Sequence, residues 1–368
     1  MKILVTGAEG FIGKNLVAEL KNQKYGVFEY DVNTLPALLD KYCKEAEFVF
    51  NLAGINRPKE QSEFMTGNFG FISALLDSLK KNNNTCPVML SSSTQAALDN
   101  PYGKSKKAGE ELLLAYGKET GAKILLYRFP NVFGKWCRPN YNSAVATFCN
   151  NISRGLPLQI NDAGTVLQLV YIDDVVRELI QALKGKENRE GNYCSVPVTY
   201  TVKLGELAEL LRSFNESRET LELPDLSDGL TKKLYSTYLS YLPPDKFSYP
   251  LKMNVDARGS FTEFIKTADS GQVSVNISGP GITKGEHWHH TKHEKFLVVS
   301  GKGIIRLRQL GTKEVIEYPV SGEKLEVLDI PPGYTHNIEN LGTADMVTLM
   351  WVNERFDPEK PDTYFQEV

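Results

Sequence analysis

The pattern of apolar and polar positions changes along the 368 residues of the chain. In the first two-thirds, short apolar runs alternate with longer stretches in which apolar residues recur at helical spacing. The expected strands are 2–6, 25–30, 48–52, 88–92 and 124–129, and the expected helices are 14–22, 64–80, 102–116, 202–214 and 230–242. Such alternation predicts an α/β fold with a doubly wound, Rossmann-type parallel sheet.

Beyond residue 250 the pattern becomes one of short strands separated by Gly, Pro and Asn. The expected strands are 261–267, 271–278, 295–300, 303–309, 313–319, 324–330 and 346–353. This texture predicts a small, all-β barrel or jelly roll. The tandem prolines Pro243 and Pro244 stop the preceding helix. We therefore predict two domains, 1–243 and 244–368.

Composition excludes several classes of protein. Lys and Arg number 42 and Asp and Glu 45, for a net charge of −3, and there is no basic block to bind nucleic acid. The five cysteines are widely spaced and are typical of reduced thiols. The chain has no run of about 18 apolar residues, so we predict no membrane helix. The chain enters a strand at once, which leaves no room for a signal peptide, so we expect a soluble, cytoplasmic protein.

A glycine-rich turn joins the first strand to the first helix and contains Gly7, Gly10 and Gly13. Glycine lets the backbone approach a pyrophosphate, and the helix N-terminus offers unpaired N–H groups and the positive end of a dipole. A plain turn is the alternative interpretation. The strand–turn–helix context favours a dinucleotide-binding loop.

The nicotinamide cofactor is not decided by these residues. Asp31 ends the second strand, where a carboxylate can bond a ribose 2′-hydroxyl and favour NAD. Lys14 and Arg57 can instead neutralise the 2′-phosphate of NADP. Both alternatives stay open on the sequence alone.

A serine run precedes a Tyr–Lys pair at the start of a helix. Tyr102 and Lys106 are four residues apart and share a helix face. An ammonium beside a phenol favours the phenolate and lowers a pKa that starts near about 10. We therefore expect Tyr102 to be the acid/base of a carbonyl–alcohol couple, with Ser93 or Thr94 binding the carbonyl oxygen. The alternative, a solvated helix face, is disfavoured by the glycine loop upstream.

The first 245 residues resemble the extended short-chain dehydrogenase/reductases. The similar segments are Thr6–Gly13, Asn51–Gly54, Tyr102 with Lys106, Arg128–Gly134 and Val170–Asp174. The resemblance implies a catalytic set of Tyr102, Lys106 and Ser93 and cofactor contacts at Ala53 and Asn131. Only eight residues separate Ser93 from Tyr102, fewer than is usual in the sugar epimerases, so Thr94 stays an alternative to Ser93.

Four of the five histidines lie within residues 287–293. Imidazole is the commonest neutral metal ligand and titrates near neutral pH. Strand alternation places His287 and His289 on one face. Together with Glu294 and the remote His336, they would provide nitrogen and oxygen ligands for a divalent ion such as zinc. If a bulge shifts the phase, His290 or His293 replaces one of them or acts as a base.

The C-terminal third resembles the cupins. Gly285, His287, His289, Glu294 and Gly301 follow the spacing of the first cupin motif, and residues 331–340 follow the second without its leading Gly. Residues 256–263 resemble the start of the deoxysugar 3,5-epimerase cupins, in which an Arg and its neighbours hold the nucleotide sugar. Those epimerases work without metal, so a histidine proton shuttle is a rival to zinc.

The two halves together resemble bifunctional enzymes of capsular polysaccharide synthesis. The resemblance implies C3 epimerisation of a UDP-4-keto-6-deoxy-N-acetylhexosamine in the cupin domain. NADPH-dependent reduction of the C4 ketone would follow, giving UDP-N-acetyl-6-deoxy-L-talosamine, a precursor of UDP-N-acetyl-L-fucosamine. We expect a homodimer, because cupins commonly pair through exposed strands. The alternatives are a non-catalytic sensor of nucleotide and sugar, and a UDP-sugar 4-epimerase or dehydratase that retains NAD.

Overall fold

The computed structural model describes residues 1–58 and 60–368. The chain forms two compact units, the first made of Met1–Leu211 with Lys233–Leu242 and the second of Arg212–Lys232 with Pro243–Val368. The predicted ranges, 1–243 and 244–368, place residues 212–232 in the first domain, whereas these residues belong to the second unit. Backbone hydrogen bonds between Leu221, Leu223 and Lys266 tie this segment to the rest of the second unit.

The first unit is built on a sheet with the strand order β2-β1-β3-β4-β5-β9-β8. All neighbouring strands in it are parallel except β8 and β9. This confirms the predicted doubly wound α/β fold. The strand bounds are β1 Lys2–Thr6, β2 Gly26–Tyr30, β3 Phe48–Asn51, β4 Val88–Ser93, β5 Ile124–Phe129, β8 Arg189–Glu190 and β9 Tyr193–Cys194.

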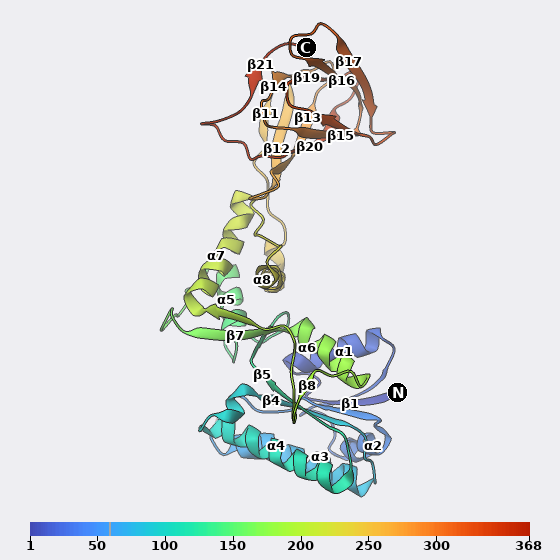
Figure 1. Cartoon of the computed structure of the whole chain (residues 1–368), viewed down its shortest axis with the longest axis vertical. Helices are drawn as coiled ribbons and strands as arrows, with labels where there is room; N and C mark the ends of the chain where they lie inside the picture. Colours follow the sequence, from blue (N-terminus) through green and yellow to red (C-terminus); the bar gives the residue numbers. More distant parts are fainter. Residues whose placement is uncertain (59) are drawn as a thin grey trace. The chain divides into compact units, whose positions relative to one another are not determined.

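Helices cover both faces of this sheet (Figure 1). Side chains of Ile3 and Val5 join one hydrophobic core with α1 (Phe11–Asn22) and α6 (Ile172–Leu183). Leu4, which points the other way, joins a second core. Because alternate residues of a strand face opposite sides, the buried run of β1 supplies both cores. The helices of the second core are α2 (Ala37–Glu45), α3 (Phe71–Lys81) and α4 (Pro101–Thr120).

The expected helix 64–80 is split in the structure. A π-helical turn, η1 (Met65–Gly70), precedes α3. Within η1, the buried Asn68 side chain exchanges hydrogen bonds with the backbone of Ile55 and donates to Ser105 Oγ. The wider turn thus carries a polar side chain into the interior, a feature that apolar periodicity does not reveal.

The first unit also contains a second, smaller sheet and further helices. The smaller sheet has the order β10-β7-β6. The bounds are β6 Asn131–Phe133, β7 Val166–Tyr171, β10 Tyr200–Lys203, η2 Thr94–Ala97, α5 Ala144–Ser153, α7 Leu204–Thr220 and α8 Gly229–Leu239, the last two lying partly in the second unit. Lys233 of α8 forms a 2.5 Å ion pair with Asp174 of α6. All five cysteines are free, and no helix among the described residues is long and apolar enough to cross a membrane.

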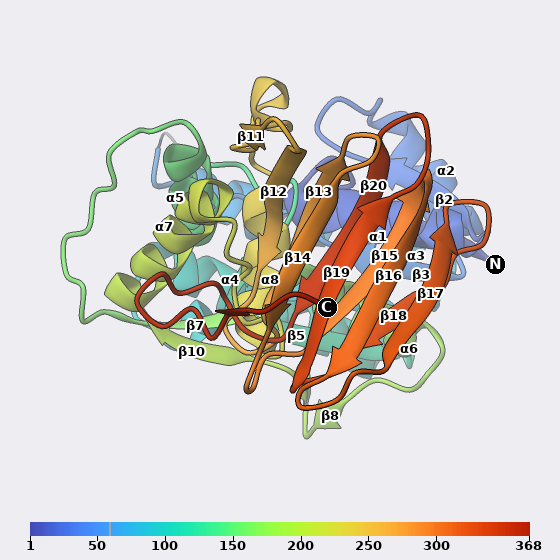
Figure 2. The same cartoon turned by 90° about the horizontal axis from the view of Figure 1, so that it is seen from above.

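The second unit contains two antiparallel sheets that enclose a core, as the jelly-roll prediction requires. Their strand orders are β11-β12-β13-β20-β15-β18 and β17-β16-β19-β14-β21; strands of both are visible in Figure 2. Phe296, Leu307 and Ile338 are among the residues of the core. The bounds are η3 Pro244–Lys246, β11 Asn254–Asp256, β12 Gly259–Lys266, β13 Gln272–Ser278, β14 Thr283–Trp288, β15 Glu294–Ser300, β16 Lys302–Gln309, β17 Val315–Ser321, β18 Val327–Ile330, β19 Tyr334–Asn340, β20 Met346–Val352 and β21 Tyr364–Phe365.

Candidate functional site

The glycine loop of the first unit is packed tightly against the end of β3. Gly7 has φ +68°, and a Cβ atom on it would lie 2.7 Å from the backbone nitrogen of Ala53. A Cβ on Gly13 would lie 2.1 Å from the Gly7 carbonyl oxygen. Gly10 is the N-cap of α1, without a side-chain cap. The loop therefore needs glycine, and it leaves the N-terminus of α1 available to an anion.

The other residues predicted to bind the cofactor are held in different ways. Asp31 follows β2, and its carboxylate accepts hydrogen bonds from the backbone N–H groups of Glu9 and Val32, each at 2.8 Å. This places Asp31 at the glycine loop. Lys14 and Arg57 are exposed. Asn131 instead donates its side-chain amide to the Gln168 carbonyl, within the smaller sheet.

Helix α4 presents the Tyr–Lys pair at its first turns. Asn100 caps the helix by accepting a hydrogen bond from Gly103 N at 2.7 Å. Tyr102 is hydrogen-bonded to Ser93, the last residue of β4. Lys106 is buried, with its Nζ 5.8 Å from the centroid of the Tyr102 ring and donating to the Ser91 carbonyl at 3.2 Å. The structure thus brings together Tyr102, Lys106 and Ser93.

The expected lowering of the pKa of Tyr102 is wrong for this structure. Burial raises the pKa of Tyr102, and the hydrogen bond from Ser93 only partly offsets it. The ammonium of Lys106 lies near the ring and bonds to the Ser91 carbonyl, while its own pKa is lowered by burial to about 8. Tyr102 is therefore a protonated phenol at neutral pH, which suits a proton donor.

The buried lysine predicts an alkaline limit to any chemistry at Tyr102. Because burial brings the pKa of Lys106 to about 8, its ammonium loses the proton as the pH rises through that value. We expect kcat/KM for carbonyl reduction to fall above about pH 8, since this profile reports the groups of the free enzyme. Initial rates measured from pH 6 to 10 test the prediction. A profile that stays flat up to pH 10 would contradict it.

The second unit gathers the four predicted metal ligands into one cluster. His287, His289, Glu294 and His336 each offer a ligand atom, and these atoms lie within 4.8 Å of one another. Glu294 Oε2 lies 3.1 Å from His336 Nε2 and 3.5 Å from His289 Nε2. All three atoms are buried without a hydrogen-bond partner. A divalent cation fits this set, because it would bind all three buried atoms. Nitrogen and oxygen atoms of this kind are ligands that zinc prefers.

The strands explain why the alternation of the histidines predicts their positions. A bulge in β14 falls at Glu286, which has φ +60°, and so precedes His287. His287 then pairs with His336 of β19, and their ring centroids lie 4.5 Å apart. The alternates point elsewhere. His290 packs against Trp288 and Tyr364, and His293 packs against Trp351; both histidines are exposed.

The protonation states of His287 and Glu294 suit a metal. Burial lowers the pKa of His287 to about 4. Burial favours the protonated form of Glu294, but the favourable electrostatic interaction with the neighbouring imidazoles of His289 and His336 outweighs it and holds the pKa of this carboxyl well below its usual range. At neutral pH His287 is neutral and Glu294 is ionised, which are the forms that ligate a cation.

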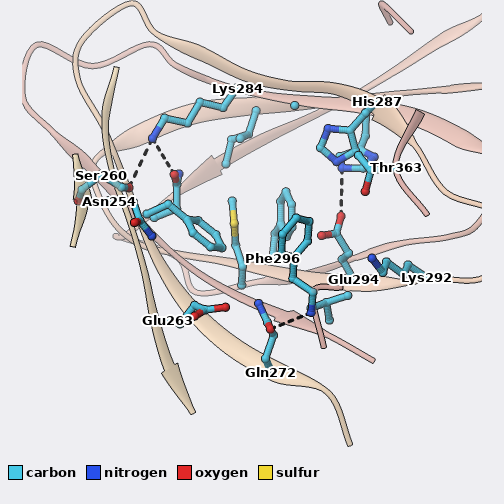
Figure 3. Close-up of a pocket in the computed structure, with 18 of the residues that line it drawn as sticks. Asn254, Ser260, Glu263, Gln272, Lys284, His287, Lys292, Glu294, Phe296 and Thr363 are labelled. Atoms are coloured by element: carbon cyan, nitrogen blue, oxygen red, sulfur yellow. Dashed lines mark hydrogen bonds and ion pairs between the residues drawn. The ribbon is translucent and has the colours of Figure 1, made fainter. Parts of the chain in front are cut away.

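The cluster lies in a cavity of about 800 Å³, the size of a small-molecule site. Figure 3 shows Lys284 on the opposite side of this cavity from His287 and Glu294. The Nζ of Lys284 donates to Asn276 Oδ1 and to the Ile277 carbonyl, each at 2.8 Å. The cavity thus combines a candidate metal site at one end with a positive charge at the other.

Known proteins share both halves of this architecture. Residues 3–195 match the NAD dependent epimerase/dehydratase family, and residues 254–364 match the polysaccharide biosynthesis C-terminal domain. A crystal structure of the capsular polysaccharide assembling protein CapF from Staphylococcus aureus is 56% identical, with a TM-score of 0.95 and 100% of both chains covered. The chain belongs to the CapF family.

Two further relatives of this CapF-family chain show how far the similarity in sequence and fold extends. The UDP-2-acetamido-2,6-beta-L-arabino-hexul-4-ose reductase of Pseudomonas aeruginosa is 47% identical over 99% of this chain and 98% of its own. The UDP-glucose 4-epimerase of Thermotoga maritima is 21% identical, with a TM-score of 0.56 over 66% of this chain and 98% of its own. The second likeness shows a shared fold alone.

A buried network behind the Tyr–Lys pair was not predicted from the sequence. Glu110, one turn beyond Lys106 on α4, accepts a hydrogen bond from Ser92 Oγ and a two-pronged ion pair from Arg128. The Arg128 guanidinium lies 4.2 Å from the centroid of the Tyr193 ring. The signal available in the sequence was the i, i+4 spacing of Lys106 and Glu110 on one helix face. The network joins α4 to the ends of β4 and β5.

Replacing Glu110 by Gln is expected to destabilise the first unit by about 3 kcal/mol, because Arg128 loses its partner in a mostly buried pair. The alkaline limb of reduction should also move to lower pH, since the charge of Glu110 raises the pKa of Lys106. Thermal unfolding of the first unit, together with the pH profile, tests both effects. The exposed neighbour Glu111→Gln is the matched control. Equal stability of the two variants would contradict this role.

Proposed function

We propose that this chain is a bifunctional nucleotide-sugar enzyme. The second unit inverts C3 of a UDP-4-keto-6-deoxy-N-acetylhexosamine, and the first unit reduces the C4 ketone with NADPH. The product is UDP-N-acetyl-6-deoxy-L-talosamine, a precursor of UDP-N-acetyl-L-fucosamine for capsular polysaccharide. The observation that carries the proposal is that one chain holds a Tyr102–Ser93–Lys106 site and a separate histidine–carboxylate cluster. The Pseudomonas relative, a reductase of a UDP-acetamido-hexulose by name, supports the reductive half.

In the second unit, the acidity of the C3 proton comes from the neighbouring ketone. His287, His289, Glu294 and His336 would hold zinc, which supplies Lewis-acid stabilisation of negative charge on the C4 oxygen. Lys284 places positive charge at the other end of the cavity, where it would hold the diphosphate of the nucleotide.

In the first unit, the partly buried phenol of Tyr102 would donate its proton to the C4 oxygen. The Ser93 hydroxyl, already bonded to Tyr102, would orient that oxygen, and Lys106 would supply positive charge behind the ring. NADPH supplies the hydride when it is bound against the loop of Gly7, Gly10 and Gly13. NADPH rather than NADH is proposed on the family resemblance, and the homodimer expected from the sequence stays a prediction.

The test follows nicotinamide turnover in the full-length protein. With the UDP-4-keto sugar as substrate, we expect one NADPH oxidised for each sugar reduced, and free NADP⁺ released in every cycle. Epimerisation or dehydration with a tightly retained NAD and no net oxidation would favour the 4-epimerase or dehydratase. Binding of nucleotide and sugar without turnover would favour the sensor.

A further inference from the structure

The last twelve residues, 357–368, form a segment that lies along the strand carrying the histidines; we call it the C-terminal strap. Its β21 pairs antiparallel with β14, with Tyr364 opposite Trp288 and Phe365 opposite His287. Beyond β21, Gln366 N donates to the Glu286 carbonyl at 2.9 Å. The strap thus continues the sheet at the strand edge from which His287 enters the cavity.

One residue of the strap, Asp362, holds the turn that follows β14. Its carboxylate accepts hydrogen bonds from the backbone N–H groups of His290, Thr291 and Lys292, at 3.0, 2.9 and 3.0 Å. Thr291 Oγ1 adds a fourth at 3.0 Å. Asp362 has φ +39°, an unusual backbone conformation for a residue other than glycine. Four residues separate His289 from the beginning of β15, and these bonds fix three of them.

The main chain of Asp362 makes a separate contact with the metal cluster. Its carbonyl oxygen lies 2.5 Å from His289 Nδ1. A carbonyl can only accept, so Nδ1 must carry the proton, and the lone pair of the neutral ring is on Nε2. Nε2 is the buried atom without a hydrogen-bond partner that lies 3.5 Å from Glu294 Oε2.

Other contacts keep the strap in register with the turn. Lys292 is buried, and its Nζ donates to the Pro361 carbonyl and lies 5.8 Å from the centroid of the Phe356 ring. Thr363, next to Asp362, lines the cavity beside the cluster (Figure 3). The position of the Asp362 carbonyl is therefore coupled to the fold of the turn through both backbone and side-chain bonds.

We propose that Asp362 is the positioning residue of the metal site, with its carboxylate locking the turn and its carbonyl fixing the tautomer and orientation of His289. Groups that orient a ligating imidazole from behind typically contribute 10- to 100-fold to metal affinity. The proposal rests on the metal role proposed for the cluster. It adds a residue far along the chain from the four ligands.

The first test is zinc affinity of the full-length protein, measured by competition with a chelator. Asp362→Ala should weaken zinc binding by roughly 10- to 100-fold. Asp362→Asn keeps the shape and one acceptor oxygen, and should lose less. Asp357→Ala is the matched control, because this exposed strap carboxylate accepts a local bond from Glu359 N. Equal affinity in Asp362→Ala and wild type overturns the proposal, whereas a wild type that binds no zinc overturns the metal role itself.

The second test reads the tautomer directly in metal-free protein. Long-range ¹H–¹⁵N NMR distinguishes Nδ1–H from Nε2–H imidazoles, and the chain has five histidines to resolve. His289, assigned by comparison with His289→Gln, should be the Nδ1–H form in wild type and in Asp357→Ala. It should lose this form in Asp362→Ala. Weaker zinc binding with the Nδ1–H form intact would assign Asp362 to packing of the turn alone and overturn the proposal.

Discussion

His336→Gln is expected to abolish metal binding and C3 epimerisation together. His336 is 1% exposed, and its Nε2 lies 3.1 Å from Glu294 Oε2, so glutamine would remove an imidazole ligand from beside the buried carboxylate. Loss of a ligand should exceed the ~10- to 100-fold effect of losing a group that merely orients one. Zinc content after dialysis and uptake of deuterium at C3 from heavy water are the measurements.

The matched control for that variant is His293→Gln. His293 comes from the same histidine-rich segment but is exposed and packs against Trp351, so zinc content and exchange should match wild type. NADPH binding to the first unit should be the same in both variants. Deuterium uptake that survives complete removal of metal would refute the zinc role and favour a histidine proton shuttle.

Tyr102→Phe is expected to lower the rate of NADPH oxidation by about 10²- to 10⁴-fold, the usual contribution of a general acid. The phenol is partly buried, protonated and hydrogen-bonded to Ser93, and phenylalanine keeps the ring without the proton. Stopped-flow or steady-state absorbance of NADPH measures the effect.

The same variant separates the two proposed activities. Deuterium exchange at C3 should persist in Tyr102→Phe, because the histidine cluster does not include this residue. The keto sugar, epimerised but not reduced, should accumulate. Loss of C3 exchange together with reduction would place both steps at one site and contradict the two-site account.

The sequence predicts these sites well where local periodicity and motif spacing set the geometry. The pair Tyr102 and Lys106 lies on one face of α4 because both belong to one helix. His287 and His289 point into one cavity because the bulge at Glu286 precedes both of them. Alternate residues of β1 likewise point into the two cores that are expected when a parallel sheet is covered by helices on both sides.

Features made by distant segments could not be predicted in this way. β19 lies outside the expected strands because Thr335, His336 and Asn337 are consecutive buried polar residues, with no apolar alternation. Asp362 reaches back about 70 residues to its turn, and nothing in its local sequence indicates a partner. The raised pKa of Tyr102 depends on burial by the surrounding fold, which the Tyr–Lys spacing alone does not report.

The central claim is that two separate sites of one chain act in turn on the same sugar. Its most direct test is the position of the isotope in the product made by the intact protein from the UDP-4-keto sugar and NADPH in heavy water. We expect a 4-hydroxy sugar that carries deuterium at C3 and, at C4, a hydrogen delivered by NADPH. A reduced product with hydrogen retained at C3 and unchanged C3 configuration would contradict it.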